Sequence, residues 1–164
     1  MTVCGTLLVE RRTILSVPAG QRGLRQADAL YQHVKNLPLL YESVFRQQPG
    51  IGVAAVCVSI APRPQDGSYM PVFLAGASAA HCTAAALNVP VWEASHQEGH
   101  IWAALWSSTP ADAAVLADTH RFLAVHLSGG TTEALVVESD ETNDAQRLRI
   151  DLVGGTQDIS AGQF

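Results

Sequence analysis

The sequence predicts an α/β fold in which helices flank a mixed β-sheet, and three observations lead to this prediction. Apolar residues recur at helical spacing from Gln26, almost continuous runs of Val and Ala lie between breakers, and the expected helices and strands alternate along the chain. The chain has 164 residues, of which 48% are hydrophobic and 15% charged. A chain of this size can bury one substantial core, so we expect residues 1–164 to form a single domain.

The first elements are expected to be a β-hairpin and two helices. Residues 2–10 and 11–17 are rich in Val, Leu and Ile and end at the breakers Pro18-Ala19-Gly20, which predicts the hairpin. A helix is expected from Gln26 to Leu37, and Pro38 is expected to open the second helix.

The middle of the chain should hold the central strand of the sheet. Ile51–Ile60 is an apolar run bounded by breakers, which is typical of a strand buried on both faces. We expect this strand, with Val53–Ser59, to be central in the mixed sheet. Periodicity predicts the later elements in order: a helix at 71–87, a strand at 89–93, a helix at 95–106, and strands at 122–127, 131–138 and 146–153. A final helix is expected to begin at Asp158, where the chain allows barely one turn.

Charge and cysteine usage restrict the possible functions. Ten basic residues against fifteen acidic ones give a net charge of -5, so RNA binding would need help from other subunits. Cys4, Cys57 and Cys82 are widely spaced, and the last two lie in apolar runs, which predicts buried reduced thiols. No leader pattern or membrane-spanning apolar run is found, so we expect a cytoplasmic protein with no membrane contact.

The sharpest local motif is His96-Gln97-Glu98-Gly99-His100. Residues four apart on a helix lie on one face, so both imidazoles could reach one metal ion, although two such histidines can equally be ordinary partly buried side chains. Glu98 points away from that face, unlike the general base of zinc proteases, which directly follows the first His. A metalloprotease is therefore only a remote alternative.

Two glycine-containing segments are further candidates. Ser128-Gly129-Gly130-Thr131-Thr132 could present backbone N–H groups to an anionic or acyl group, or could be only a hairpin turn. Pro62-Arg63-Pro64 with Gly67-Ser68-Tyr69 could be a ligand loop at the carboxyl end of a strand, or only a rigid connection.

Taken together and in order, these segments resemble the tRNA threonylcarbamoyltransferase family, formerly called glycoproteases or O-sialoglycoprotein endopeptidases. The family order is strand, glycine and proline loop, Ala-rich helix, strand, His-x-Glu-Gly-His, strand and Ser-Gly-Gly-His-Thr. The segments Gly23–Asp28 and Gln32–Pro38 are similar to the divergent branch found in Gram-positive bacteria. The resemblance implies the N-terminal lobe of a two-lobed fold of the actin, sugar-kinase and Hsp70 ATPase-like (ribonuclease H-like) class.

The resemblance also implies residue roles and partners. His96 and His100 would bind a divalent metal, iron or zinc. His126, Leu127, Ser128, Gly129 and Gly130 would contact threonylcarbamoyl-AMP. The implied reaction transfers the threonylcarbamoyl group to the tRNA adenosine beside the anticodon, with tRNA held through a complete complex with other threonylcarbamoyladenosine synthase subunits.

The chain departs from the family pattern in two motifs, and two segments of the family would lie outside the given sequence. Thr131 stands where most members have His, and Ala61-Pro62-Arg63-Pro64 replaces a Gly-Pro-Gly loop. The family's Asp-Thr-Ser phosphate loop would precede Thr2, and its second lobe, with the third metal ligand, would follow Phe164. We therefore expect a truncated enzyme, inactive alone and with an incomplete ligand set. The alternative is a non-catalytic scaffold or regulatory paralogue of the synthase complex.

Overall fold

A computed structural model describes residues 6–20, 23–109, 119–127, 130–139 and 148–157, and these residues form two compact units. Unit 1 spans residues 1–96 and unit 2 spans residues 97–164. The prediction of one incomplete lobe of a two-lobed family stays a prediction. The expected helix at Asp158 lies outside the described residues.

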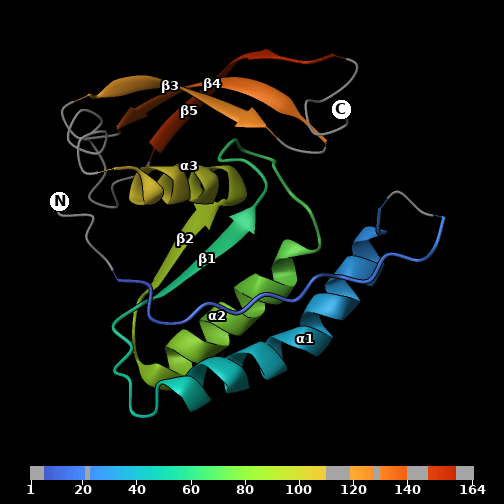
Figure 1. The fold of residues 1–164 in the computed structure, drawn as a ribbon, viewed down its shortest axis with the longest axis vertical. Helices are drawn as coiled ribbons and strands as arrows, with labels where there is room; N and C mark the ends of the chain where they lie inside the picture. Colours follow the sequence, from blue (N-terminus) through green and yellow to red (C-terminus); the bar gives the residue numbers. More distant parts are fainter. Residues whose placement is uncertain (1–5, 21–22, 110–118, 128–129, 140–147, 158–164) are drawn as a thin grey trace. The chain divides into compact units, whose positions relative to one another are not determined.

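Unit 1 contains a parallel βαβ motif with one further helix. Helix α1 is Gln26–Gln47, strand β1 is Val56–Ala61, helix α2 is Phe73–Leu87 and strand β2 is Val91–Ser95. Strands β1 and β2 pair in parallel, as the crossover through α2 requires. Helix α2 packs against β1 on one side and contacts α1 (Figure 1).

Small side chains allow α2 to approach its neighbours closely. The buried residues of α2 are Ala75, Ala80 and Ala84. A Cβ on Gly76 would lie 3.6 Å from Cγ2 of Val58 on β1, which is ordinary van der Waals contact. The helix ends at Asn88, whose φ of 53° is left-handed and whose N–H donates to the carbonyls of Ala84 and Ala85.

The predicted hairpin at residues 2–17 is wrong for its described part, because residues 6–18 contain no strand. The segment instead runs beside α1 (Figure 1). The N–H of Ser16 donates to Oε1 of Gln32 at 2.8 Å, and Nε2 of Gln32 donates back to the Ser16 carbonyl at 3.0 Å. Nε of Arg11 donates to Oγ of Ser43 at 2.7 Å. The side chain of Gln32 therefore satisfies both backbone groups of Ser16, which a hairpin could have paired with another strand.

Two further boundaries differ from the sequence-based expectation. Pro38 lies inside the single helix α1 and does not open a second one. The ring removes one backbone hydrogen bond, but the apolar face of the helix continues past it. Strand β1 starts at Val56, not at Val53, and it is only partly buried because β2 is its one paired strand among the described residues.

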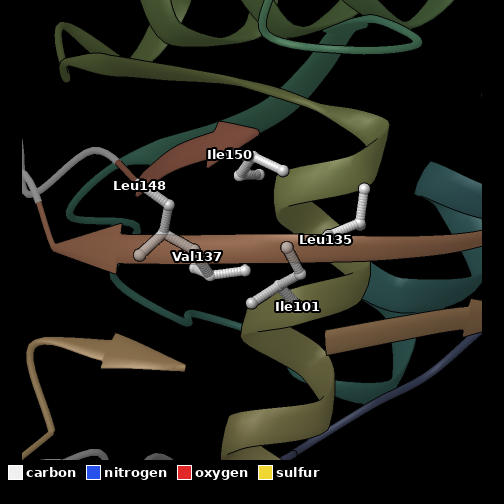
Figure 2. Packing of buried hydrophobic residues seen from close by; sticks show 5 residues of the cluster. All are labelled: Ile101, Leu135, Val137, Leu148 and Ile150. Atoms are coloured by element: carbon white, nitrogen blue, oxygen red, sulfur yellow. The ribbon is translucent and has the colours of Figure 1, made fainter. Parts of the chain in front are cut away.

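Unit 2 is a helix packed on one face of an antiparallel sheet. Helix α3 is His96–Ser107, so the unit boundary falls after its first residue. Strands β3 (Arg121–Leu127), β4 (Thr132–Ser139) and β5 (Leu148–Gly155) form the sheet in that order. Its core, shown in Figure 2, consists of Ile101, Leu135, Val137, Leu148 and Ile150. Apolar residues at alternate positions of β4 and β5 thus turn inward to meet the apolar side of α3.

The predicted α/β class is confirmed. Where we expected one mixed sheet, the described strands form a parallel pair and a separate antiparallel sheet of three. Cys57 and Cys82 are free thiols as predicted, but the prediction that they are buried is wrong, because both are exposed. Cys57 lies on an exposed side of β1 and Cys82 on an exposed side of α2, and the apolar character of the neighbouring residues did not reveal this.

Candidate functional site

The histidine motif lies at the start of α3, where the sequence predicted a helix. Strand β2 ends at the buried Ser95, and α3 begins at the next residue, His96. His96 and His100 are one helical turn apart on α3. The ring of His96 lies edge-on to Phe73, with centroids 6.1 Å apart and an interplanar angle of 64°.

His100 lies next to another histidine that the motif alone did not include. Its ring centroid is 5.1 Å from that of His126 on β3, and the two planes are tilted by 37°. His126 belongs to the inward-facing set of β3, together with Phe122 and Ala124, which pack against the core of unit 2. The helix motif and the strand that precedes the glycine turn therefore meet within one compact unit.

A buried carboxylate and a buried amide complete this cluster, which we call the His100–His126 cluster: Gln97, His100, His126 and Glu133. Glu133 on β4 pairs directly across the sheet from His126, and its Oε2 lies 3.8 Å from Nδ1 of His126. Nε2 of Gln97, one residue into α3, donates to the same Oε2 at 3.3 Å. Gln97 and Glu133 are 4% and 7% exposed, respectively.

Two polar atoms of the cluster have no hydrogen-bond partner among the residues that the structure describes. Both Oε1 of Gln97 and Nδ1 of His126 are buried from solvent without one. An unsatisfied buried polar atom typically costs about 1–3 kcal/mol. Both atoms belong to side chains beside the Glu133 carboxylate. An unsatisfied buried polar atom in a native structure calls for an explanation, and a functional role is one such explanation.

The chemistry of the cluster suits a transition metal better than a hard cation. Imidazole nitrogens suit zinc, iron, copper and nickel, whereas magnesium and calcium prefer oxygen ligands. Within the described ranges, no group of three or more His, Cys, Asp or Glu side chains is placed to hold one ion. His96 and His100, which the resemblance assigns to a metal, therefore have no third ligating side chain beside them among the described residues, and metal binding stays a prediction.

Of the five residues predicted to contact the adenylate, the structure describes His126, Leu127 and Gly130. Ser128 and Gly129 lie outside the described residues, so their convergence with His96 stays a prediction. Leu127 pairs with Thr132 across the β3–β4 ladder, which confirms that the two strands are paired directly and antiparallel. His126 and Leu127 face opposite sides of β3, because successive residues of a strand alternate. Only His126 of this pair faces the His100–His126 cluster.

The loop after β1 is closed by its own hydrogen bonds. Oγ of Ser68 accepts from the N–H of Arg63 at 3.0 Å, and the N–H of Ser68 donates to the Gln65 carbonyl at 3.1 Å. Gly67 has a φ of 78°, a conformation that favours glycine. The rigid-connection interpretation of this loop therefore has a structural basis, and its role as a ligand loop stays a prediction.

Unit 1 carries a separate surface pair. His81 on α2 and Glu93 on β2 meet at 2.8 Å between Nε2 and Oε1, with both side chains well exposed. Exposed pairs of this kind contribute about 0–1 kcal/mol to stability. We treat this pair as a surface contact, which makes His81 a useful control histidine.

No model of a known protein family matches the chain. Among the described residues, no helix is long and apolar enough to cross a membrane.

Proposed function

We propose that the chain acts in tRNA threonylcarbamoyladenosine biosynthesis, in the transfer of the threonylcarbamoyl group from threonylcarbamoyl-AMP to the adenosine beside the anticodon. The observation that supports this best is the contact between His100 and His126. The family resemblance assigns the first residue to the metal and the second to the adenylate. A shared reaction centre requires these two assignments to meet in space.

The proposed transfer makes and breaks one bond at the carbamoyl carbon. The N6 amino nitrogen of the adenosine bonds to this carbon, the bond from carbon to the AMP phosphate oxygen breaks, the amino group loses a proton, and AMP leaves. A bound divalent metal would supply Lewis-acid polarisation of the carbamoyl oxygen. We propose that His96 and His100 hold this metal, as in the resembling family.

The chain's own residues would position the donor substrate. The backbone of the turn at residues 128–130 would contact the threonylcarbamoyl-adenylate, and His126 would border it at the end of β3. Glu133 pairs across the sheet from His126, and its Oε2 lies 3.8 Å from Nδ1 of that imidazole, so a small approach would let it orient the ring. A preoriented group costs no reorganisation when the reaction occurs, which is the main advantage of such positioning.

The tRNA would be held mainly by other subunits. The net charge of -5 offers no general attraction for a phosphate backbone. We therefore place the chain in a complex with other threonylcarbamoyladenosine synthase subunits that supply the basic surface.

A non-catalytic scaffold or regulatory paralogue of the same complex is the second candidate. Thr131 in place of the family's histidine, together with Ala61-Pro62-Arg63-Pro64 in place of its glycine-rich loop, favours this alternative. A scaffold would bind synthase subunits without needing the adenylate.

Equilibrium binding of a stable threonylcarbamoyl-AMP analogue separates the two candidates. A transfer function predicts that the chain binds the analogue more tightly than AMP and that His126→Ala weakens this binding. The exposed His81→Ala is the matched control. Binding to synthase subunits with no adenylate binding would support the scaffold.

A further inference from the structure

The outer face of the unit 2 sheet carries a line of large apolar side chains. The inner face of this sheet packs against α3 (Figure 1). An antiparallel sheet with one covered face normally has polar residues on the other. On β3, however, the outward residues after Arg121 are Leu123, Val125 and Leu127, which are 62%, 60% and 61% exposed. These three side chains project from the same face because residues of a strand alternate between its two sides.

Strand β4 extends this apolar surface toward the middle of the sheet. Val136 pairs directly with Leu123, and Ala134 pairs with Val125. Paired residues of neighbouring strands point to the same face and contact each other. Large contiguous apolar patches on the surface of a soluble protein mark interaction sites. We call these five residues the outer apolar patch: Leu123, Val125, Leu127, Ala134 and Val136.

The charged side chains of the same face form a neutral row at one end of the patch. Nε of Arg121 lies 3.0 Å from Oε1 of Glu138, and Nη1 of Arg149 lies 3.7 Å from Oε2 of the same carboxylate. Nε of Arg149 also lies 3.2 Å from Oδ2 of Asp151. Two cations thus face two anions, so this row attracts neither a strongly acidic nor a strongly basic partner. A second copy of the chain would not be repelled at this face, although the whole chain carries a net charge of -5.

We infer that the outer apolar patch is the surface through which two copies of this chain associate face to face. A two-fold interface brings the same patch of both copies together. An axis near Val125, perpendicular to the strands, would oppose the apolar residues of the two copies and would put the two charged rows at opposite ends. The apolar residues would then leave water without any like charges meeting. The interface involves residues of unit 2 alone and needs neither adenylate nor tRNA.

The size of the face indicates a weak, reversible dimer. The strands β3, β4 and β5 have seven, eight and eight residues. With standard strand spacing and rise, such a face measures about 14 Å by 25 Å, which is about 350 Å². Stable interfaces bury about 800 Å² on each partner, and markedly smaller ones are weak and transient. We therefore expect monomers at submicromolar concentration and dimers at high micromolar concentration.

The test is analytical ultracentrifugation of the untagged full chain from submicromolar to millimolar concentration. Val125→Glu should weaken dimerisation by about 10-fold or more, because it places two like charges beside the two-fold axis. Val34→Glu is the matched control, because Val34 is 57% exposed on α1, outside unit 2. It should dimerise like the unchanged chain. Circular dichroism of both variants checks that they fold.

Methyl resonances of the unchanged chain test the same inference without any substitution. The signals of Leu123, Val125 and Leu127 should shift together as the concentration rises, and the signals of Val34 should not. Added salt should leave the dimerisation constant nearly unchanged, because salt screens charges and does not weaken apolar contact.

Three outcomes would overturn the inference. A chain that stays monomeric at millimolar concentration would show that the patch does not bind a second copy. Dimers that persist in Val125→Glu but are lost in Val34→Glu would place the interface on α1. Shifts of the patch signals on adding a separately expressed second lobe of the resembling family, with no self-association, would identify that lobe as the occupant.

Discussion

The rings of His100 on α3 and His126 on β3 lie 5.1 Å apart, centroid to centroid. This relationship depends on the packing of α3 against the sheet, because Ile101 follows His100 directly and contacts the core of unit 2. The position of the candidate site is thus coupled to the stability of this core.

The first prediction concerns the core of unit 2. Leu135 is 1% exposed at the centre of the core, whereas Leu123 is 62% exposed on the opposite face of the sheet. Leu135→Ala should lower the free energy of unfolding by about 2–5 kcal/mol, because it leaves a cavity. Leu123→Ala should change it by less than about 0.5 kcal/mol. Urea unfolding followed by tryptophan fluorescence measures both variants, and equal losses would show that the inward and outward faces are wrongly assigned.

A second prediction concerns the glycine inside α2. Gly76→Ala should raise the free energy of unfolding by about 0.5–1 kcal/mol, because alanine loses less backbone entropy in a helix. The added methyl group would meet Val58 at an ordinary contact distance of 3.6 Å. Thermal unfolding followed by circular dichroism is the measurement. A clear destabilisation would mean that α2 packs more closely on β1 than the structure describes.

The third prediction concerns the segment at residues 6–20. Gln32 makes two hydrogen bonds to the backbone of Ser16, and Gln32→Leu removes both. Each such bond is worth about 0.5–1.5 kcal/mol, so hydrogen exchange at the Ser16 amide should accelerate while exchange in α2 is unchanged. Gln32→Glu, which keeps the acceptor for the Ser16 N–H, should have a smaller effect at this amide. Unchanged exchange at Ser16 in Gln32→Leu would show that this contact does not hold the segment.

Most helices and strands could be predicted from the sequence because their apolar spacing reflects one buried face. The Ala-rich helix near 71–87 and the helix at 95–106 occur within two residues of the expected bounds, as α2 and α3. The strands β3 and β4 likewise match their predicted alternation. These elements form where local spacing and tertiary packing favour the same conformation.

The elements that were predicted wrongly depend on partners distant in sequence. Residues 6–18 have strand-like composition, but they are held by Gln32 and Ser43 of α1, which local spacing cannot reveal. Pro38 is normally a helix boundary, and only the packing of the whole of α1 decides that the helix continues.

The candidate site could be predicted only in part. The spacing of His96 and His100 indicated a shared helix face, and α3 provides that helix. The contact of His100 with His126 depends on the packing of α3 on β3, and the approach of Glu133 depends on the β3–β4 register. The signal in the sequence that could have indicated them was a polar residue at positions 126 and 133, where the other inward-facing positions of the same strands are mainly apolar.

Threonylcarbamoyl transfer measured by mass spectrometry of tRNA nucleosides tests the central claim most directly. The chain would be combined with threonylcarbamoyl-AMP, tRNA, the other synthase subunits and a separately expressed second lobe from a member of the resembling family. We expect threonylcarbamoyladenosine to form with the unchanged chain and with His81→Ala, to fall by about 100-fold or more with His100→Ala because metal polarisation is lost, and not to form with the chain alone. No modification by this mixture, with the same tRNA fully modified by a complete synthase, would contradict the proposed function.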